Sequence, residues 1–164
     1  MSANQTKRPS AEREGAEAAS GHLISVTVGG QLFGIPVLQA QDVLNPQRIV
    51  RIPLAPAAIA GSLNLRGRIV TAIDLRSCLG LPACPDPSAS MSVVTEREGE
   101  LYSLLVDSVG EVMTLSPDSF EQTPGTLRQL WREVCDGIYR LDGQLLLVLN
   151  VGRVLDGLRT ADAA

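Results

Sequence analysis

Two separate stretches of this chain, residues 61–76 and 137–151, repeat one pattern of glycines and aliphatic residues. Each has a short apolar segment, a turn that contains glycine and a second apolar segment, which is the pattern of a β-hairpin. The matched pairs, all 76 positions apart, are Gly61 and Gly137, Leu65 and Leu141, Gly67 and Gly143, and Asp74 and Asn150. A chain with this repeat is constrained to build two similar β units.

A second repeat precedes each of these hairpins. Residues 30–35 (Gly-Gln-Leu-Phe-Gly-Ile) resemble residues 99–104 (Gly-Glu-Leu-Tyr-Ser-Leu) at an offset of 69 positions. The four blocks occur in the same order in both halves, which favours a tandem duplication in which each unit hides its apolar face against the other. Chance similarity between unrelated hairpins is the alternative.

The bulk composition limits the class of protein. The 164 residues suit one domain or two small units that share a core, and the net charge of −4 with only 3% aromatic residues disfavours a nucleic-acid partner. No apolar run is long enough for a membrane-spanning helix or a signal peptide. We expect a cytoplasmic protein with a disordered N-terminal tail over residues 1–21.

Short strands alternate with turns along most of the chain, which predicts a mainly β fold built as a pair of small barrels. Proline-rich residues 82–90 form the expected junction between the units. A further strand is expected over residues 49–52. Short helices are expected over residues 36–44, 76–81, 126–134 and 151–158.

The sequence offers little for catalysis. His22 is the only histidine and borders the predicted tail, and the three cysteines lack the spacing of a zinc site or a disulfide framework. Cys78 is the best candidate nucleophile, because Arg76 beside it would lower the pKa of its thiol. The alternative is that Cys78 is a small apolar residue on a helix face, and we predict no enzyme.

Two charged residues interrupt apolar segments. Asp42 lies within the predicted helix 36–44, and Arg66 lies at the turn of the first repeated hairpin. They can pair with each other, present charge at the rim of a binding surface, or simply be solvated. Periodicity does not separate these interpretations.

Taken together, these motifs resemble the CheW family of chemotaxis coupling proteins over about residues 21–158. The resemblance is carried by residues 30–35, 40–43, 51–53, 64–67 (Asn-Leu-Arg-Gly) and 74–76 (Asp-Leu-Arg), and by residues 105–112 and 137–150 in the second half. It implies two five-stranded, SH3-like β-barrel subdomains around a shared hydrophobic core, with short helices. The implied domain covers residues 22–158, with units at about 22–81 and 91–158 that are allowed to exchange terminal strands, and a tail at 159–164.

The resemblance also implies a non-catalytic scaffold without cofactor or metal. Family members join the cytoplasmic tips of chemoreceptors to the regulatory domain of the histidine kinase CheA, itself similar to CheW, within receptor arrays. An acidic residue and the arginine of the Asn-Leu-Arg-Gly motif contribute to partner binding, and they fall on Asp42 and Arg66. Asp42 replaces the usual glutamate and is one methylene shorter, which leaves open whether the two form a direct ion pair.

Further partner-binding residues follow from the expectation that the helical receptor tip lies in the groove between the barrels. The candidates are Leu38, Val43, Gly61 and Asn64 in the first unit and Val106 in the second.

Three other functions remain as alternatives at this stage. The first is a coupling protein of a non-flagellar chemosensory pathway, such as one for surface sensing or pili. The second is a small-barrel nucleic-acid binder. The third is an enzyme that uses Cys78.

Overall fold

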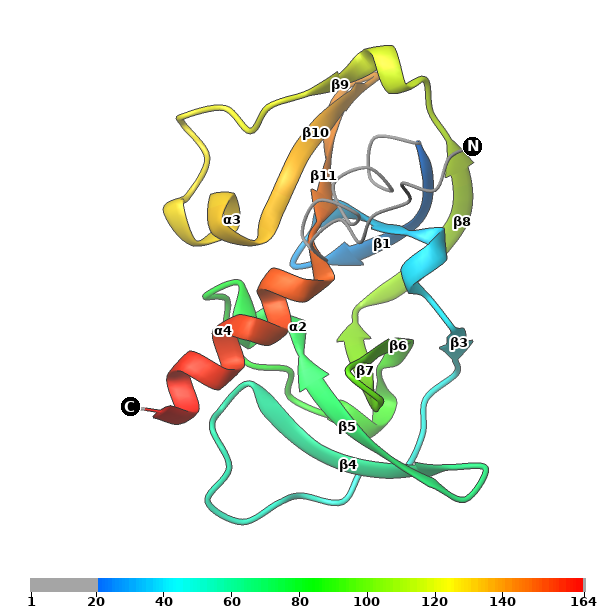
Figure 1. Ribbon diagram of the computed structural model, residues 1–164, viewed down its shortest axis with the longest axis vertical. Coiled ribbons are helices and arrows are strands. Elements are labelled where there is room, and N and C mark those ends of the chain that lie inside the picture. Colours follow the sequence, from blue (N-terminus) through cyan, green and yellow to red (C-terminus); the bar gives the residue numbers. More distant parts are fainter. Residues whose placement is uncertain (1–20, 164) are drawn as a thin grey trace, which may run out of the picture.

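The computed structural model describes residues 21–163, which form two β-sheets, sheet A and sheet B, with helices between them (Figure 1). Across sheet A the strands are β8 (Ser108–Thr114), β1 (His22–Val28), β2 (Gln31–Pro36), β11 (Gln144–Leu149), β10 (Cys135–Leu141) and β9 (Phe120–Glu121). Across sheet B they are β3 (Asp42–Leu44), β6 (Met91–Arg97), β7 (Glu100–Val106), β5 (Arg68–Asp74) and β4 (Ile59–Leu65). The predicted mainly β fold in two subdomains is confirmed.

The hydrogen-bond registers reproduce the sequence repeat residue by residue. Each sheet contains one parallel pair, in which Leu32 of β2 lies opposite Leu146 of β11, and Leu101 of β7 lies opposite Val70 of β5. Leu32 and Leu101 are 69 positions apart, and Val70 and Leu146 are 76 positions apart, which are the two offsets of the repeat. The hairpin β1–β2 therefore corresponds to β6–β7, and β4–β5 corresponds to β10–β11.

The two sequence units exchange hairpins to form the sheets. In sheet A the hairpin β1–β2 pairs with β10–β11 from the second unit, and in sheet B the hairpin β6–β7 pairs with β4–β5 from the first. Each unit thus supplies strands to both sheets, and the sequence boundaries at residues 22–81 and 91–158 describe the repeat and not the sheets.

A single chain segment joins the two edges of each sheet. After β3, the chain reaches the opposite edge of sheet B, where Val50 bridges to Ser62 of β4. After β8, it reaches the opposite edge of sheet A, where Glu121 of β9 pairs with Ile138 of β10. These crossings bring the edges of each sheet together, as a barrel-like subdomain requires.

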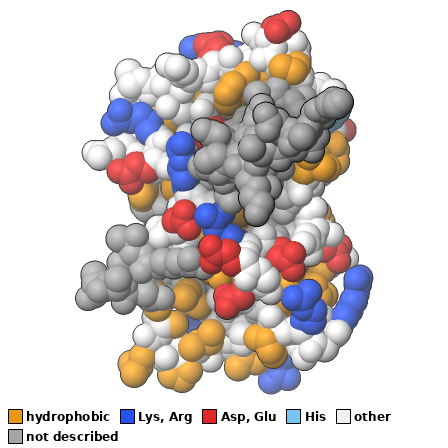
Figure 2. Space-filling model, viewed as in Figure 1, with side chains coloured by type: hydrophobic (Ala, Val, Ile, Leu, Met, Phe, Trp, Pro, Cys, Tyr) orange, Lys and Arg blue, Asp and Glu red, His pale blue; other side chains and the backbone are white. Residues whose placement is uncertain are grey.

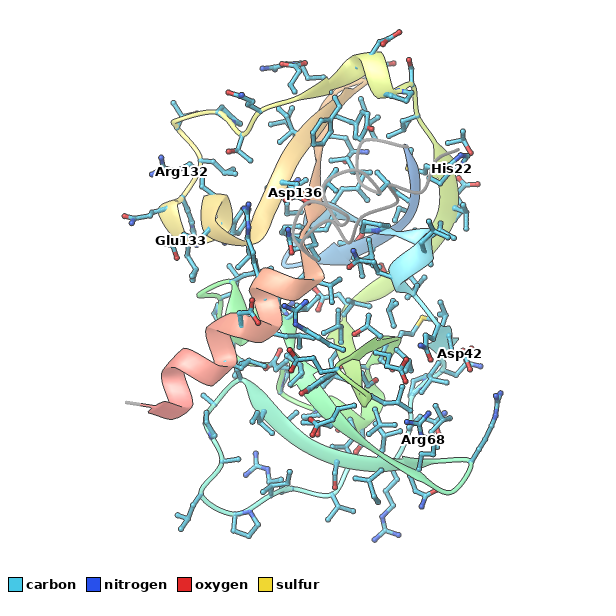
Figure 3. All side chains as sticks on the ribbon, viewed as in Figure 1. His22, Asp42, Arg68, Arg132, Glu133 and Asp136 are labelled. Carbon is cyan, nitrogen blue, oxygen red and sulfur yellow. The ribbon has the colours of Figure 1, made fainter. Side chains whose placement is uncertain are left out.

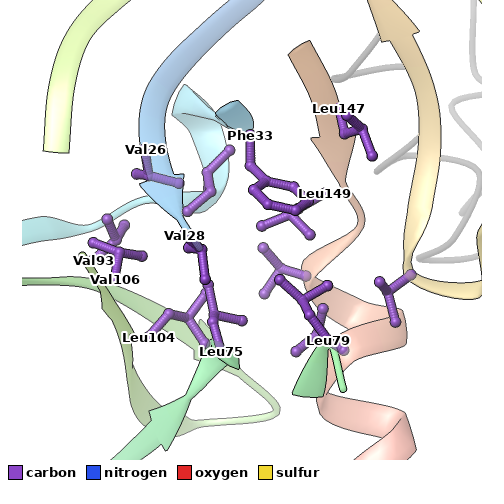
Figure 4. Close-up of a cluster of buried hydrophobic side chains, with 14 of the residues drawn as sticks. Val26, Val28, Phe33, Leu75, Leu79, Val93, Leu104, Val106, Leu147 and Leu149 are labelled. Carbon is purple, nitrogen blue, oxygen red and sulfur yellow. The ribbon is translucent and has the colours of Figure 1, made fainter. Parts of the chain in front are cut away.

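A large apolar cluster lies between the two sheets (Figure 4). Val28 and Phe33 enter it from sheet A, Leu104 from sheet B, and Val154 and Leu155 from the C-terminal helix α4 (Val151–Ala163). Smaller clusters fill each subdomain separately. Burial of this shared core is the main favourable term that holds the subdomains together.

Several local predictions were wrong. Residues 36–44 form the 3-10 helix η1 (Val37–Gln39) followed by β3, because β3 pairs with β6 as the edge strand of sheet B and Gln41 N–H donates to Val94 O at 2.7 Å. Residues 49–52 form a loop apart from the Val50 bridge.

The helices are placed close to where the sequence predicts them. They are α2 (Leu75–Cys78), α3 (Gln129–Val134) and α4, which continues through most of the predicted tail at 159–164. The predicted N-terminal tail lies outside the described residues except for Gly21. Within residues 21–163, no helix is both long and apolar enough to cross a membrane.

Candidate partner-binding site

The turn of the β4–β5 hairpin presents the arginine singled out by sequence. Arg66 and Gly67 both have positive φ, 53° and 86°, which is the conformation of a type I′ turn. Asn64 stabilises this turn, because its Oδ1 accepts a hydrogen bond from Gly67 N–H at 2.9 Å. The turn leaves the Arg66 side chain 82% exposed.

Asp42 reaches Arg66 from the opposite edge of sheet B. The distance between Arg66 Nη2 and Asp42 Oδ2 is 3.6 Å, so the shorter aspartate does form a direct ion pair. Both side chains contact solvent, and a second exposed pair, Arg68 with Glu96 at 3.9 Å, lies nearby. Figure 3 shows both Asp42 and Arg68 at the right of the lower subdomain. Exposed pairs of this kind add little stability and keep their charge available to a partner.

Two predicted apolar contacts lie where the chain passes from sheet A into sheet B. Leu38, in η1, is 78% exposed, and Val43, in β3, is partly exposed. Val112 of β8 is also exposed, and it lies opposite Ile24 of β1 as Val43 lies opposite Val93 of β6. Exposed apolar side chains of this kind are available for docking of another protein.

Gly61 and Val106 have different surroundings. Gly61 is buried with φ at +152°, and a Cβ there would lie 2.2 Å from the carbonyl oxygen of Val50. Val106 is 2% exposed and belongs to the core between the sheets. These two residues shape the scaffold from within, whereas Asp42, Arg66, Leu38 and Val43 face outward.

Sequence analysis missed an exposed apolar loop at residues 51–58. Ile52 is partly exposed, and Leu54 is fully exposed with a positive φ of 63°. The loop forms one wall of a pocket of about 490 Å³ that also includes Cys84 and the buried Asp74. Pro53 and Pro56 were the available signal, because two prolines in an apolar run exclude the central strand that such a run otherwise suggests.

An ion pair missed by sequence analysis joins the subdomains. Arg76 donates to both carboxylate oxygens of Asp107, at 2.9 and 2.8 Å, and Asp107 also accepts from Gly29 N–H at 2.8 Å. The hydrogen bond from Arg76 holds the pKa of Asp107 below its usual value, with a smaller contribution from Gly29. The same bond raises the pKa of Arg76.

The cysteine chemistry considered from sequence is contradicted. Burial, and then the nearby charge of Asp74, raises the pKa of the Cys78 thiol to about 12, and Arg76 is engaged with Asp107. Burial likewise raises the pKa of Cys135 to about 12. A thiol in this state does not ionise at neutral pH and is a poor nucleophile. In residues 21–163, no group of three His, Cys, Asp or Glu side chains is placed to hold a metal ion.

Known proteins are similar to this chain in sequence and in fold. A family model described as the CheW-like domain matches residues 22–159. The chain is 25% identical over 132 residues to a chemotaxis protein CheW of Rhizobium meliloti, covering 80% of this chain and 85% of that protein. It is 30% identical over 115 residues to protein PilI of Pseudomonas aeruginosa, covering 70% of this chain and 64% of PilI. The crystal structure of the scaffolding protein TtCheW from Thermoanaerobacter tengcongensis matches with a TM-score of 0.70 at 25% identity, covering 80% of this chain and 89% of TtCheW.

Proposed function

This chain belongs to the CheW-like domain family, and from that premise we propose that it couples chemoreceptors to a CheA-type histidine kinase. Its role is that of a chemotaxis scaffold without catalytic activity. Such a scaffold works by binding, so its function depends on outward-facing side chains and not on a reactive group. We place it in the cytoplasm, held at receptor arrays by its protein partners.

The observation that supports this most directly is the surface formed by Asp42 and Arg66. The pair brings together β3 and the β4–β5 turn, which are far apart in sequence, and leaves both charges accessible. An exposed arginine at a rigid turn can form paired hydrogen bonds with a partner's carboxylate. We assign this surface to the charged part of partner recognition.

Leu38 and Val43 supply the apolar part of the same proposal. They lie on the connection between the subdomains, which is where a helical hairpin such as a receptor tip would lie in a groove. We assign them to the receptor side, with Val112 from sheet A as an additional contact. Gly61 and Val106 support these surfaces from within, and Asn64, which is exposed and accepts a hydrogen bond from Gly67 N–H, is assigned to the partner surface beside Arg66.

The likeness to PilI supports a second candidate, a coupling protein of a pilus-type or surface-sensing pathway. That pathway would use the same fold and the same kind of partner surface. The two candidates differ only in which receptor and which kinase the chain binds, and identification of those partners decides between them.

The test is capture of the tagged full-length chain from its host, followed by identification of the proteins that co-purify. We expect a CheA-type kinase and a chemoreceptor with the wild-type chain, and binding weaker by about tenfold or more with Arg66→Glu, since loss of one charge-assisted contact costs about 1.4 kcal/mol or more. Arg132→Glu, an equal charge change on exposed α3, is the matched control. Absence of both partners, or equal binding by the two variants, would overturn the proposal.

A further inference from the structure

Two segments that are separate in the sequence enclose a pocket that the proposed partner surface does not use. Residues 51–57 line this pocket of about 490 Å³, together with part of the junction at residues 83–87 and the start of β4. Most of the lining residues are apolar, and Ile52, Leu54 and Ile59 are the largest of them. Ligand sites in proteins have this size and combine apolar walls with a few polar groups. The pocket can therefore hold a small organic molecule.

Leu54 borders this pocket and yet is fully exposed. Its φ of 63° lies in the left-handed region, which is unfavourable for a residue with a Cβ. Figure 2 shows apolar side chains gathered over the lower end of the molecule, where Figure 1 places this loop beside β4. A strained backbone that keeps a leucine in water gains nothing from burial in the free protein, and such strain is concentrated at functional sites, ligand clamps among them. Contact with an apolar ligand in the pocket would bury this side chain.

Arg51 supplies the available charge of the pocket. Its side chain is exposed, and among residues 21–163 no ion pair involves it. Asp74 also borders the pocket but is only 4% exposed. Its carboxylate accepts hydrogen bonds from the N–H groups of Arg76 and Cys84 and from the Ser77 hydroxyl. The charge of Asp74 is therefore compensated within the protein, whereas that of Arg51 is open to a ligand.

We propose that this pocket binds a small organic anion, with the apolar body of the ligand against Leu54 and its carboxylate paired with Arg51. A guanidinium can bind a carboxylate through two parallel hydrogen bonds, which fixes the orientation of the ligand. An apolar cation is disfavoured, because it would approach Arg51 without a free carboxylate to meet it. The site shares no residue with the surface of Asp42 and Arg66, so the inference is independent of kinase and receptor binding.

The test is a titration of the purified full-length chain followed by two-dimensional proton–nitrogen NMR. The three probes share one ring system and differ in charge: 2-naphthoate, 2-naphthalenemethanol and 2-naphthylmethylammonium. We expect 2-naphthoate to shift backbone amide signals within residues 51–60 and 83–84, with a dissociation constant of about 1 mM. The neutral probe should bind about fivefold more weakly than the anion, and the cation more weakly still.

Two variants separate the charged contact from the apolar one. Arg51→Gln should remove the preference for the anion over the neutral probe. Arg48→Gln, an equal charge change at an exposed arginine outside the pocket, should keep that preference. Leu54→Gly should weaken binding of the anion and of the neutral probe alike, by about fivefold, because it removes an apolar contact. Glycine adopts a positive φ without strain, so this variant should melt close to wild type, and its weaker binding is then not a loss of folding.

A filled pocket gives the last check. Ala83 lies in the exposed junction and borders the pocket, so Ala83→Phe can place a ring there while Arg51 and Leu54 are kept. This variant should lose the shifts caused by 2-naphthoate. The proposal is overturned by any of four results: no shift at about 10 mM 2-naphthoate, shifts that lie outside this pocket, equal binding of the anion and the cation, or an Arg51→Gln variant that still prefers the anion.

Discussion

The subdomains built on sheet A and sheet B share a backbone but differ at their surfaces. Both have a parallel pair at the centre, and both have a bulge in the matched strand, between Ile59 and Gly61 in one and between Cys135 and Gly137 in the other. The charge at the matched hairpin tips is reversed. Residues that the backbone geometry requires are kept in both copies, and exposed residues such as Arg66 and its counterpart Asp142 have diverged. The comparison therefore separates framework from function within one chain.

The helices that follow the repeated hairpins show the same division. Asp74 accepts a hydrogen bond from Arg76 N–H at the start of α2, and Asn150 accepts one from Arg153 N–H at the start of α4. Beyond these matched caps, α2 has four residues, whereas α4 has thirteen and reaches sheet B, where its Asp156 lies 3.2 Å from Arg97. The helix of the second copy therefore extends from the end of sheet A to an ion pair with sheet B.

The largest expected effect concerns the glycines at the matched bulges. In Gly61→Ala the new Cβ would lie 2.2 Å from a backbone oxygen at a backbone φ of +152°, and in Gly137→Ala it would lie 2.4 Å from Glu121 O with no positive φ. We expect Gly61→Ala to lower the free energy of unfolding by about 3 kcal/mol or more and Gly137→Ala by about 2 kcal/mol. Urea unfolding followed by circular dichroism measures both.

A third glycine separates the cost of an unfavourable backbone conformation from the cost of a steric clash. Gly143 has a φ of +82° but no atom within 4 Å of a built Cβ, so Gly143→Ala tests conformation without a clash. We expect it to cost about 1 kcal/mol. If Gly143→Ala were as damaging as Gly61→Ala, close approach of the crossing segment would not be the reason for glycine at the bulge.

Asp74 and Asn150, which cap the starts of α2 and α4, should not be interchangeable. Both oxygens of Asp74 accept hydrogen bonds, one from Arg76 N–H and the other from the Ser77 hydroxyl and Cys84 N–H. In Asp74→Asn an NH₂ group replaces one of these oxygens and meets groups that themselves donate. Asn150 donates to Asp136, so Asn150→Asp places two carboxylates together. Each change should cost about 2 kcal/mol in urea unfolding. Full stability of both variants would show that the two caps are equivalent, against this comparison.

The sequence was sufficient to predict the repeat because glycines and aliphatic residues encode the hairpins locally. It was insufficient for β3, since Asp42–Leu44 is too short to show an alternating pattern and is ordered by its partner β6. The exchange of hairpins between units could not be read from local pattern, because either hairpin can pair with either copy. In the candidate site, the charges of Asp42 and Arg66 were visible, but the burial of Val106 is a tertiary property.

A smaller effect is expected at the ion pair between the subdomains. The pKa of Asp107 is lowered in the folded state, so its contribution is present above the unfolded value of about 3.9 and is lost as pH falls through the folded pKa. Asp107→Asn should therefore cost about 1 kcal/mol at pH 7, and the difference from wild type should be smaller at about pH 2. Urea unfolding at both pH values is the measurement. A difference that persisted at the lower pH would assign the effect to packing and not to charge.

The smallest expected effect on stability is at the pair that matters most for the proposed function. Arg66 and Asp42 are 3.6 Å apart and both are exposed, so a double-mutant cycle of Arg66→Ala and Asp42→Ala should give a coupling energy below about 0.5 kcal/mol. Asp142→Ala, at the matched tip of sheet A, should be equally neutral for folding. The effect of Arg66→Ala should then appear in binding. We expect this variant to capture less of the partner, while its free energy of unfolding stays unchanged. A large coupling energy would instead make the pair part of the framework, and the division between shared frame and divergent surface would fail at its central residue.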